Sequence, residues 1–346
     1  MFLKIKTQIE KELQVYAQSF DKLYSLNQLS PVLFGKIKEY ILRPGKRVRP
    51  ILFCIGYLGF AKKTPSGLYR SALSLELLHD FMLVHDDIID KSATRRSLPS
   101  MHVLFNNYLK KEKCAKFNGE DLSIVIGDVM YAMALDAFLN VKEDLHRKEN
   151  ALRKLISSAL YTGSGEFIEL LLGIKPLDKV TQNDIYKIYD NKTANYTFAS
   201  PLTMGATLAG ARKNQIHKLF RYGMLLGRAF QIQDDIIGTF GAEKETGKSN
   251  LSDIKEAKKT ILIWYAFKKS PLNDQQIIKK VLRSKTIKKS QILKIRKIII
   301  QTGALNYAQT QIKNLYSQAQ RQILGSKMHK KLLKTLDNFA LKTLKI

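Results

Sequence analysis

Apolar residues recur at helical spacing from one end of this chain to the other. Alternation of apolar and polar residues, which is typical of strands, is scarce, and the 346 residues include only 8 prolines and 19 glycines. In two stretches, Ser71 to Ile89 and Lys218 to Ile237, apolar side chains cover most of the predicted helix surface. Such helices need burial on nearly every side. The sequence therefore predicts an all-α protein.

Further helices are expected over residues 2–26, 30–42, 49–60, 122–140, 149–173, 183–210 and 258–269, followed by a C-terminal set after Asp274. The polar segments 110–121 and 240–253 are expected to be loops. No change of composition marks a boundary, and no internal repeat is visible. Residues 1–346 are therefore predicted to form a single domain.

The composition is that of an ordinary globular protein, with 45% hydrophobic and 25% charged residues. The N-terminus has no apolar signal region, and no stretch approaches the length of a membrane span. We therefore expect a cytoplasmic protein without an integral membrane segment. Cys54 lies in an apolar run and Cys114 in a lysine-rich one, so the two cysteines do not indicate a disulfide framework.

The chain carries a formal charge of +28, and its basic residues are densest over 268–297 and 327–345. Solvated helix faces in a lysine-rich protein are the simplest interpretation of this charge. The non-enzymatic alternative is a basic helical protein that binds nucleic acid or an acidic membrane. That alternative gives no role to carboxylates set among apolar residues.

Two acidic clusters lie at the ends of the two apolar stretches. They read Asp86-Asp87-Ile88-Ile89-Asp90 and Gln233-Asp234-Asp235-Ile236-Ile237-Gly238. Carboxylates this dense among apolar residues repel one another unless cations lie between them. Asp86 and Asp90 are four residues apart, so both leave the same face of a helix. Oxygen ligands with no Cys or His cluster suit Mg²⁺, which usually bridges carboxylates to substrate phosphates.

Several groups of cations complete the pattern expected for phosphorylated substrates. Guanidinium groups bind phosphate oxygens in pairs and Lys supplies a point charge, so such groups can hold a diphosphate without metal. The strongest candidates are Lys46, Arg47 and Arg49 in one turn and Arg95-Arg96 after the first acidic cluster, with Lys192-Thr193, Lys248 and Lys258-Lys259 as further candidates.

Taken together, these motifs resemble those of the trans-isoprenyl diphosphate synthases, the polyprenyl synthetase family, and most closely the archaeal-type geranylgeranyl diphosphate synthases. The resemblance covers nearly the whole chain. It rests, in order, on Gly45-Lys46-Arg47-Val48-Arg49-Pro50, Glu76-Leu77-Leu78-His79, His85-Asp86-Asp87-Ile88-Ile89-Asp90, Thr94-Arg95-Arg96, Gly127-Asp128, Lys192-Thr193-Ala194, Phe230-Gln231-Ile232-Gln233-Asp234-Asp235, Gly247-Lys248, Lys258-Lys259-Thr260 and Thr302-Gly303-Ala304.

The resemblance implies a single helical bundle around a central apolar cavity, two or three Mg²⁺ ions per subunit, and a homodimer. The implied metal ligands are Asp86, Asp87, Asp90 and Asp234. The allylic diphosphate would bind to Arg95, Lys192, Thr193, Gln231, Lys248 and Lys258, and isopentenyl diphosphate, without metal, to Lys46, Arg49, His79 and Arg96. The residues expected to act in catalysis are Asp86, Asp87, Asp90, Arg95, Lys192, Asp234 and Asp235.

The implied reaction is a head-to-tail (1'-4) condensation. Metal ions and cations neutralise the diphosphate of dimethylallyl, geranyl or farnesyl diphosphate, the carbon–oxygen bond ionises, and the double bond of isopentenyl diphosphate attacks the cation. A proton is then lost. No dedicated base is visible, and the family picture, in which the departing diphosphate takes the proton, explains its absence.

Product length depends in this family on bulk just before the first acidic motif. Phe81 lies five residues before Asp86, with Met82 beside it, and this resembles synthases of geranylgeranyl diphosphate. Phe81 as an ordinary core residue is the alternative, and a farnesyl or longer product remains open. A class I terpene cyclase is a second enzymatic alternative, but such an enzyme would not need the cations at Gly45–Pro50. Gly238 replaces the third aspartate of the second acidic motif, which leaves Asp234 and Asp235.

Overall fold

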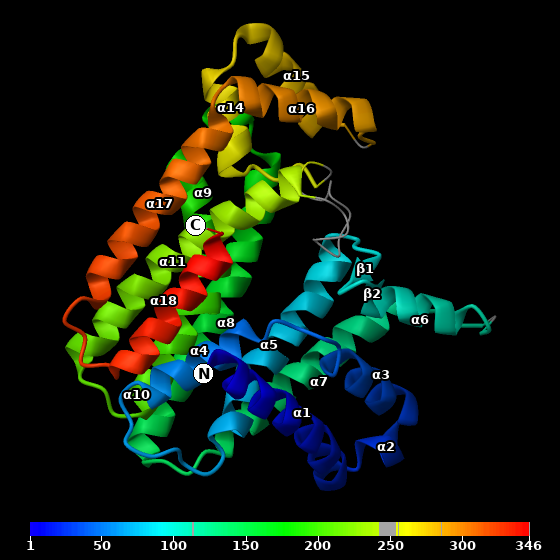
Figure 1. Ribbon diagram of the computed structural model, residues 1–346. Helices are drawn as coiled ribbons and strands as arrows, with labels where there is room; N and C mark the ends of the chain where they lie inside the picture. Colours follow the sequence, from blue (N-terminus) through cyan, green and yellow to red (C-terminus); the bar gives the residue numbers. More distant parts are fainter. Residues whose placement is uncertain (113, 242–253, 255, 285, 346) are drawn as a thin grey trace. The chain divides into compact units, whose positions relative to one another are not determined.

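The computed structural model describes residues 1–112, 114–241, 254, 256–284 and 286–345. Helices make up this part of the chain almost entirely (Figure 1), which confirms the all-α prediction. The only strands within the described residues are β1 (Thr94–Arg95) and β2 (Leu98–Pro99). These strands pair in an antiparallel hairpin, with Arg95 opposite Leu98.

The fold divides into two compact units, which are described separately here. Unit 1 contains residues 1–155 and 204–211, and unit 2 contains residues 156–203 and 212–346. The prediction that residues 1–346 form a single domain stays a prediction.

Unit 1 is built around α5 (Leu68–Ile89). This helix packs against α7 (Gly119–Leu139), α4 (Val48–Leu58) and α1 (Phe2–Tyr24). Every residue from Ser71 to Leu78 is buried, because neighbouring helices cover all sides of this half of α5. The remaining helices of the unit are α2 (Leu26–Leu29), α3 (Pro31–Ile41), α6 (Met101–Leu109), the start of α8 (Leu145–Ile174) and the end of α10 (Ser200–Leu208).

Unit 2 is centred on α11 (Lys213–Phe240). On one side α11 packs against a π-helix, η2 (Tyr189–Ala199), and on another against α17 (Ala304–Ile323). A π-helix of this length is unusual, and such elements occur mostly at functional sites. The other elements are η1 (Leu177–Lys179), α9 (Gln182–Ile188), α14 (Ile261–Lys269), α15 (Leu272–Leu282), α16 (Lys289–Gln301) and α18 (Lys330–Leu344).

Local signals account for most differences from the expected helix limits. The first helix ends at Tyr24 because Ser25 takes a left-handed conformation with φ 53°. Helix α7 begins at Gly119, three residues earlier than expected, because Asn118 and Asp121 form a capping box there. Thr260 caps α14 and delays its start to Ile261. The short helix α6 and the β1–β2 hairpin were not predicted.

The prediction of a single α-helix over residues 183–210 is wrong in detail. The chain passes from α9 into the π-helix η2 and then into α10 without leaving a helical path. The backbone hydrogen bonds of a π-helix span five residues instead of the four of an α-helix. The sequence pattern alone does not distinguish these two cases.

One described helix, α7, is long and apolar enough to cross a membrane by length and composition, with a mean hydropathy of 1.7 over its most apolar window. The expectation that no stretch approaches this length was therefore wrong. Helices at the core of globular proteins pass the same test, and α7 buries Ile126, Met130 and Phe138 within unit 1.

Candidate active site

The first acidic cluster occupies the last turn of α5. Asp86 and Asp90 are half-buried and leave one face of the helix, and Asp90 ends the helix as its C-cap. Asp87 points elsewhere and is completely buried. The cluster therefore offers two carboxylates at a partly accessible surface and a third within the protein.

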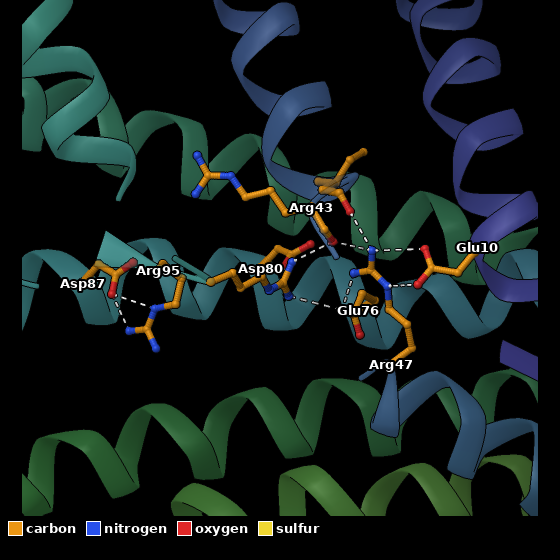
Figure 2. A network of polar contacts seen from close by, with 9 residues as sticks. Glu10, Arg43, Arg47, Glu76, Asp80, Asp87 and Arg95 are labelled. Carbon is orange, nitrogen blue, oxygen red and sulfur yellow. Dashed lines mark hydrogen bonds and ion pairs between the residues drawn. The ribbon is translucent and has the colours of Figure 1, made fainter. Parts of the chain in front are cut away.

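Arg95, on β1, lies against this buried carboxylate (Figure 2). Its Nε donates to Oδ1 of Asp87 at 2.8 Å, and its Nη2 donates to the same oxygen. Nη2 also lies 3.6 Å from a carboxylate oxygen of Asp86. The β1–β2 hairpin thus holds a guanidinium beside the acidic face, while Asp87 compensates its charge within the protein.

A second cationic group surrounds the middle of α5. Arg47 is fully buried, and its side chain reaches between α1 and α5 (Figure 2). Nη1 donates to Glu76 at 2.6 Å, and Nε donates to Glu10 at 3.0 Å. Nη2 donates to the carbonyls of Ile41 and Arg43, at the end of α3, at 3.3 and 2.8 Å.

The backbone of Arg47 is as constrained as its side chain. It is the N-cap of α4 and lies in the left-handed region, with φ 52°, which costs energy in a residue other than glycine. The buried hydrogen bonds of the guanidinium compensate that cost. They hold the turn that carries exposed Lys46 and half-buried Arg49, the two cations predicted on either side of Arg47.

Arg96 lies beside the same face of α5. Its Nη2 donates to Asp80 at 3.0 Å and approaches Glu76 at 3.4 Å, while Nη1 donates to the carbonyl of Arg43 at 3.4 Å. Asp80 is completely buried, and its second carboxylate oxygen has no hydrogen-bond partner within the described residues. Burial raises the pKa of Asp80 to about 7, against the opposing effect of Arg96.

His79 lies half-buried among these cations. Burial lowers its pKa well below the usual range, and the positive charges of Arg49, Arg96, Arg95 and Arg47 lower it further. The imidazole is therefore neutral at neutral pH. Four predicted residues, Lys46, Arg49, His79 and Arg96, are thus all found in unit 1, around a network that sequence reasoning missed.

The sequence did not single out Glu10, Arg43 or Asp80 of this network, and it contained Glu76 only as part of a motif. Arg47 was expected to bind phosphate, whereas it binds buried carboxylates and carbonyls. A partial signal was present for Arg47, because it is one of three cations in the six-residue turn 45–50. One of the three pairs with carboxylates inside the protein instead. Nothing in the sequence identifies which one, since the choice depends on Glu10, more than thirty residues away.

In unit 2 the predicted residues come together on η2 and α11. Thr193 donates to the amide oxygen of Gln231 at 2.6 Å, and the amide nitrogen of Gln231 donates to Asp235 at 3.0 Å. Lys192 pairs with Glu166 and with Glu169, the latter at 2.5 Å. These two ion pairs hold the ammonium group of Lys192 beside α8.

Asp235 and Asp234 have different surroundings. Asp235 is buried and accepts a hydrogen bond from the hydroxyl of Tyr189, which in turn accepts one from the backbone N–H of Ile261 at 2.9 Å. Asp234 is exposed. Tyr189 links η2, α11 and the start of α14, and the sequence analysis missed it. Lys258 lies 2.6 Å from Glu256, whereas Lys248 lies outside the described residues.

Two glycines allow η2 to lie close to its neighbours. A Cβ on Gly227 of α11 would come within 2.4 Å of the Cα of Ala194, and one on Gly165 of α8 within 2.8 Å of the backbone nitrogen of Lys192. Both distances are too short for any side chain. The position of Lys192 and Thr193 therefore depends on the absence of side chains at these two positions.

Phe81 lies one turn before the acidic cluster, next to an aromatic group of its own unit. Its ring centroid lies 4.7 Å from that of His85 and 5.3 Å from that of Tyr131 on α7. Phe81 and Met82 are both half-buried. The aromatic side chain is thus held on two sides.

The carboxylates of the acidic cluster fit a magnesium ion whose coordination shell is completed by a substrate. Within the described residues, no group of three or more His, Cys, Asp or Glu side chains could hold a metal ion. Asp86 and Asp90 supply oxygen atoms only, and Mg²⁺ is usually bound by one or two carboxylates together with substrate phosphates and water. Two half-buried carboxylates on one helix face match that requirement.

The family model and the similar proteins agree on one family. A model of the polyprenyl synthetase family matches residues 31–299. The geranylgeranyl diphosphate synthase of Sulfolobus acidocaldarius is 30% identical over 317 residues, which cover 90% of this chain and 91% of the relative. The geranylfarnesyl diphosphate synthase of Aeropyrum pernix is 30% identical over 298 residues, which cover 85% and 87%.

The fold has close counterparts among solved structures. A geranylgeranyl pyrophosphate synthase from Corynebacterium glutamicum, crystallised with isoprenyl diphosphate and magnesium, matches with a TM-score of 0.90 and 24% identity. The match covers 99% of this chain and 98% of that one. At this identity the likeness shows the fold.

Proposed function

Because the chain belongs to the polyprenyl synthetase family and is a prenyltransferase, we propose that it condenses isopentenyl diphosphate with an allylic diphosphate, and that geranylgeranyl diphosphate is its main product. The observation that carries this proposal is the pair of cationic arrangements along α5. One lies beside the carboxylates Asp86 and Asp90, and the other lies one to three turns earlier, around Glu76 and Asp80.

The cations around Glu76 and Asp80 are proposed to bind isopentenyl diphosphate. Lys46, Arg49 and Arg96 supply positive charge, and neutral His79 can donate a hydrogen bond. Arg47 holds the turn and Asp80 holds Arg96, so the cations are positioned before a substrate arrives. Such preorganisation lowers the entropy lost on binding.

The acidic end of α5 is proposed to bind the allylic diphosphate through Mg²⁺ held by Asp86, Asp90 and Asp87. Two or three such ions, when bound, would neutralise the leaving diphosphate. Arg95 adds a guanidinium to the same diphosphate, and its contact with Asp87 fixes its orientation. Because Asp87 is buried against Arg95, we expect Asp86 and Asp90 to carry more of the metal binding.

The residues of unit 2 have proposed roles of their own. Asp234 is the proposed metal ligand, and Lys192, Thr193, Gln231, Lys248 and Lys258 are the proposed diphosphate ligands. Asp235 is proposed to act indirectly, because its hydrogen bonds to Tyr189 and Gln231 support both η2 and α11. After ionisation, the departing diphosphate is proposed to take the proton lost from the condensed product.

Phe81 is proposed to end the space for the growing chain. Its contacts with His85 and Tyr131 support a rigid role, since a ring held on two sides cannot yield to a longer product. The relatives leave the exact length open, because geranylgeranyl and geranylfarnesyl diphosphate synthases match equally well in identity. The chain is further proposed to be a cytoplasmic homodimer.

A product assay tests the function. The purified protein is incubated with Mg²⁺, isopentenyl diphosphate and geranyl or farnesyl diphosphate, and the extracted products are identified by mass spectrometry after removal of the diphosphate. We expect geranylgeraniol, and we expect no product with Asp86→Asn or after chelation of the metal. A cyclic hydrocarbon would instead indicate a terpene cyclase, and no condensation at all would contradict the proposal.

A further inference from the structure

The basic residues of the chain are unevenly distributed, and the catalytic proposal does not use most of them. Between Pro271 and Thr302, nine residues are Lys or Arg, and Asp274 is the single acidic residue. This segment contains α15 and α16, which pack against each other and against α14 (Figure 1). An excess of one sign on two adjacent helices attracts anions far more than dispersed charges do.

Helix α16 has two different faces. Ile292, Ile295, Ile298 and Ile299 are buried against the rest of unit 2. On the opposite side, Leu293 is 54% exposed and Ile300 is 57% exposed. These two residues are seven positions apart, which is close to two helical turns, so they lie on one stripe of the exposed surface.

Exposed lysines flank the two aliphatic side chains. Lys289 lies on the same stripe, and Lys294 and Lys297 lie beside it. The next residue inward, Arg296, has two guanidinium nitrogens that are buried and lack a hydrogen-bond partner within the described part of the chain. We call the surface formed by Lys289, Leu293, Lys294, Lys297 and Ile300 the α16 face. It combines aliphatic groups with positive charge and no acidic residue.

The side chains of the α16 face favour one of three possible partners: a second copy of the chain, nucleic acid or a lipid bilayer. A second copy of the same face would bring like charges together, which opposes association. Nucleic acid is favoured by aromatic side chains that stack on bases, and neither α15 nor α16 contains an aromatic residue. Aliphatic side chains flanked by lysines with long apolar stems are typical of helices that lie in the interface of a lipid bilayer.

We propose that the α16 face binds the surface of an anionic lipid bilayer, with Leu293 and Ile300 inserted at the level of the headgroups and the lysines on the lipid phosphates. Two contributions to the binding free energy then add together. The lysines are attracted to the anionic surface, and the aliphatic groups are buried in it. The inference does not depend on the catalytic activity.

Vesicle sedimentation with the full chain tests this proposal. The protein is mixed with vesicles of phosphatidylcholine alone, or of phosphatidylcholine with an equal part of phosphatidylglycerol, and the bound fraction is measured at rising salt concentration. We expect binding to the mixed vesicles only, weakening as salt increases. Equal binding to both kinds of vesicle, or none to either, would overturn the proposal.

Variants separate the two kinds of contact. Leu293→Gln with Ile300→Gln should weaken binding by roughly tenfold or more, whereas the exposed Leu324→Gln should not. Lys294→Glu with Lys297→Glu should weaken binding by at least about fivefold per lysine. The matched control, Lys330→Glu with Lys334→Glu on α18, changes the net charge equally. Far-ultraviolet circular dichroism checks that each variant is folded, and equal losses in variants and controls would overturn the proposal.

Two competitors test other sources of anions. Inorganic diphosphate should not displace the vesicles, because a bilayer offers many phosphates and an apolar interior at once. Full displacement would show a discrete phosphate pocket and overturn the proposal. A duplex oligonucleotide is the second competitor. If it displaces the vesicles, and if it binds the wild type and the Leu293→Gln, Ile300→Gln variant equally, the surface binds nucleic acid and the proposal is overturned.

Discussion

Single residues on α5 have distinct electrostatic surroundings, although they lie within four turns of one helix. Glu76 binds buried Arg47, Asp80 binds half-buried Arg96, and His79 is neutral. Asp86 and Asp90 reach a partly accessible surface. The difference arises from which guanidinium lies nearest to each side chain.

Replacement of Arg47 by methionine should destabilise the protein strongly. Glu76 would remain buried without its closest cation, and breaking a buried ion pair from one side costs roughly 3–5 kcal/mol. Urea unfolding measures the loss. The control is Arg153→Met, which breaks the exposed Arg153–Glu149 pair and should change the free energy of unfolding by less than about 1 kcal/mol. Equal effects of the two variants would contradict the role given to Arg47.

The stability of the folded chain should fall in mild acid because of His79. Its pKa in the folded state is below that of the unfolded chain, so acidification below about pH 6.5 protonates the unfolded chain first and favours unfolding. The slope from one such group is at most about 1.4 kcal/mol per pH unit. His79→Gln should lose this component of the pH dependence, while replacement of exposed His146 should not. Parallel stability profiles for wild type and His79→Gln would be inconsistent with this account.

Replacement of Phe81 by alanine should lengthen the product. The variant removes the ring next to His85 and Tyr131, and we expect chains at least one isoprene unit longer, identified by mass spectrometry of the dephosphorylated products. Phe117→Ala, an exposed ring of unit 1, serves as the control and should leave the length unchanged. Unchanged products from Phe81→Ala would assign Phe81 to the ordinary core.

At the scale of elements, the π-helix η2 is the most consequential feature of unit 2. It carries Lys192 and Thr193, and it lies so close to α8 and α11 that glycines are required at the contacts. Tyr189 fixes its start through Asp235 and the first residue of α14. The helix therefore depends on tertiary contacts more than on its own sequence.

Gly227→Ala should disturb this packing. The added Cβ would lie 2.4 Å from the Cα of Ala194, and an overpacked core typically loses about 1–3 kcal/mol. Gly35→Ala on α3 is a matched control, because a Cβ there meets nothing within 4 Å and alanine should stabilise the helix by roughly 0.5–1 kcal/mol. Thermal unfolding of the two variants should therefore shift in opposite directions, and shifts of the same sign would contradict the close packing.

At the scale of the whole molecule, two helices expose apolar side chains that bear on the proposed homodimer. On α7, Ile124, Val125 and Leu139 are exposed, with Val125 at 53%. Helix α8 exposes a further series within unit 2, formed by Ile156, Leu160, Phe167, Leu171 and Ile174. Apolar stripes of this kind on regular helices mark protein interfaces. They support the proposed homodimer.

Val125→Asp should therefore convert a dimer into monomers. A charge placed in an apolar interface lacks a partner, and its desolvation opposes association. Sedimentation equilibrium measures the molecular mass in solution, with Leu324→Asp as a control at an exposed site on another part of the chain. A monomeric wild type, or a dimeric Val125→Asp variant with unchanged affinity, would remove α7 from the interface.

The sequence alone determined the helical class and the family, because apolar periodicity and short motifs are local properties of the chain. It predicted Lys46, Arg49, His79 and Arg96 as a group. It did not distinguish Asp87, buried against Arg95, from Asp86 and Asp90, since all three are alike in the motif. Nor did it identify Arg47 and Tyr189 as buried links.

Only the tertiary structure decided these assignments. Whether a charged side chain binds substrate or stabilises the fold depends on its burial and on partners far away in sequence, such as Glu10 for Arg47 and Ile261 for Tyr189. The π-helix η2 likewise lies in close contact with Gly165 and Gly227, which are distant from it in the sequence. The local pattern selects the elements, and the packing of those elements assigns each charge its role.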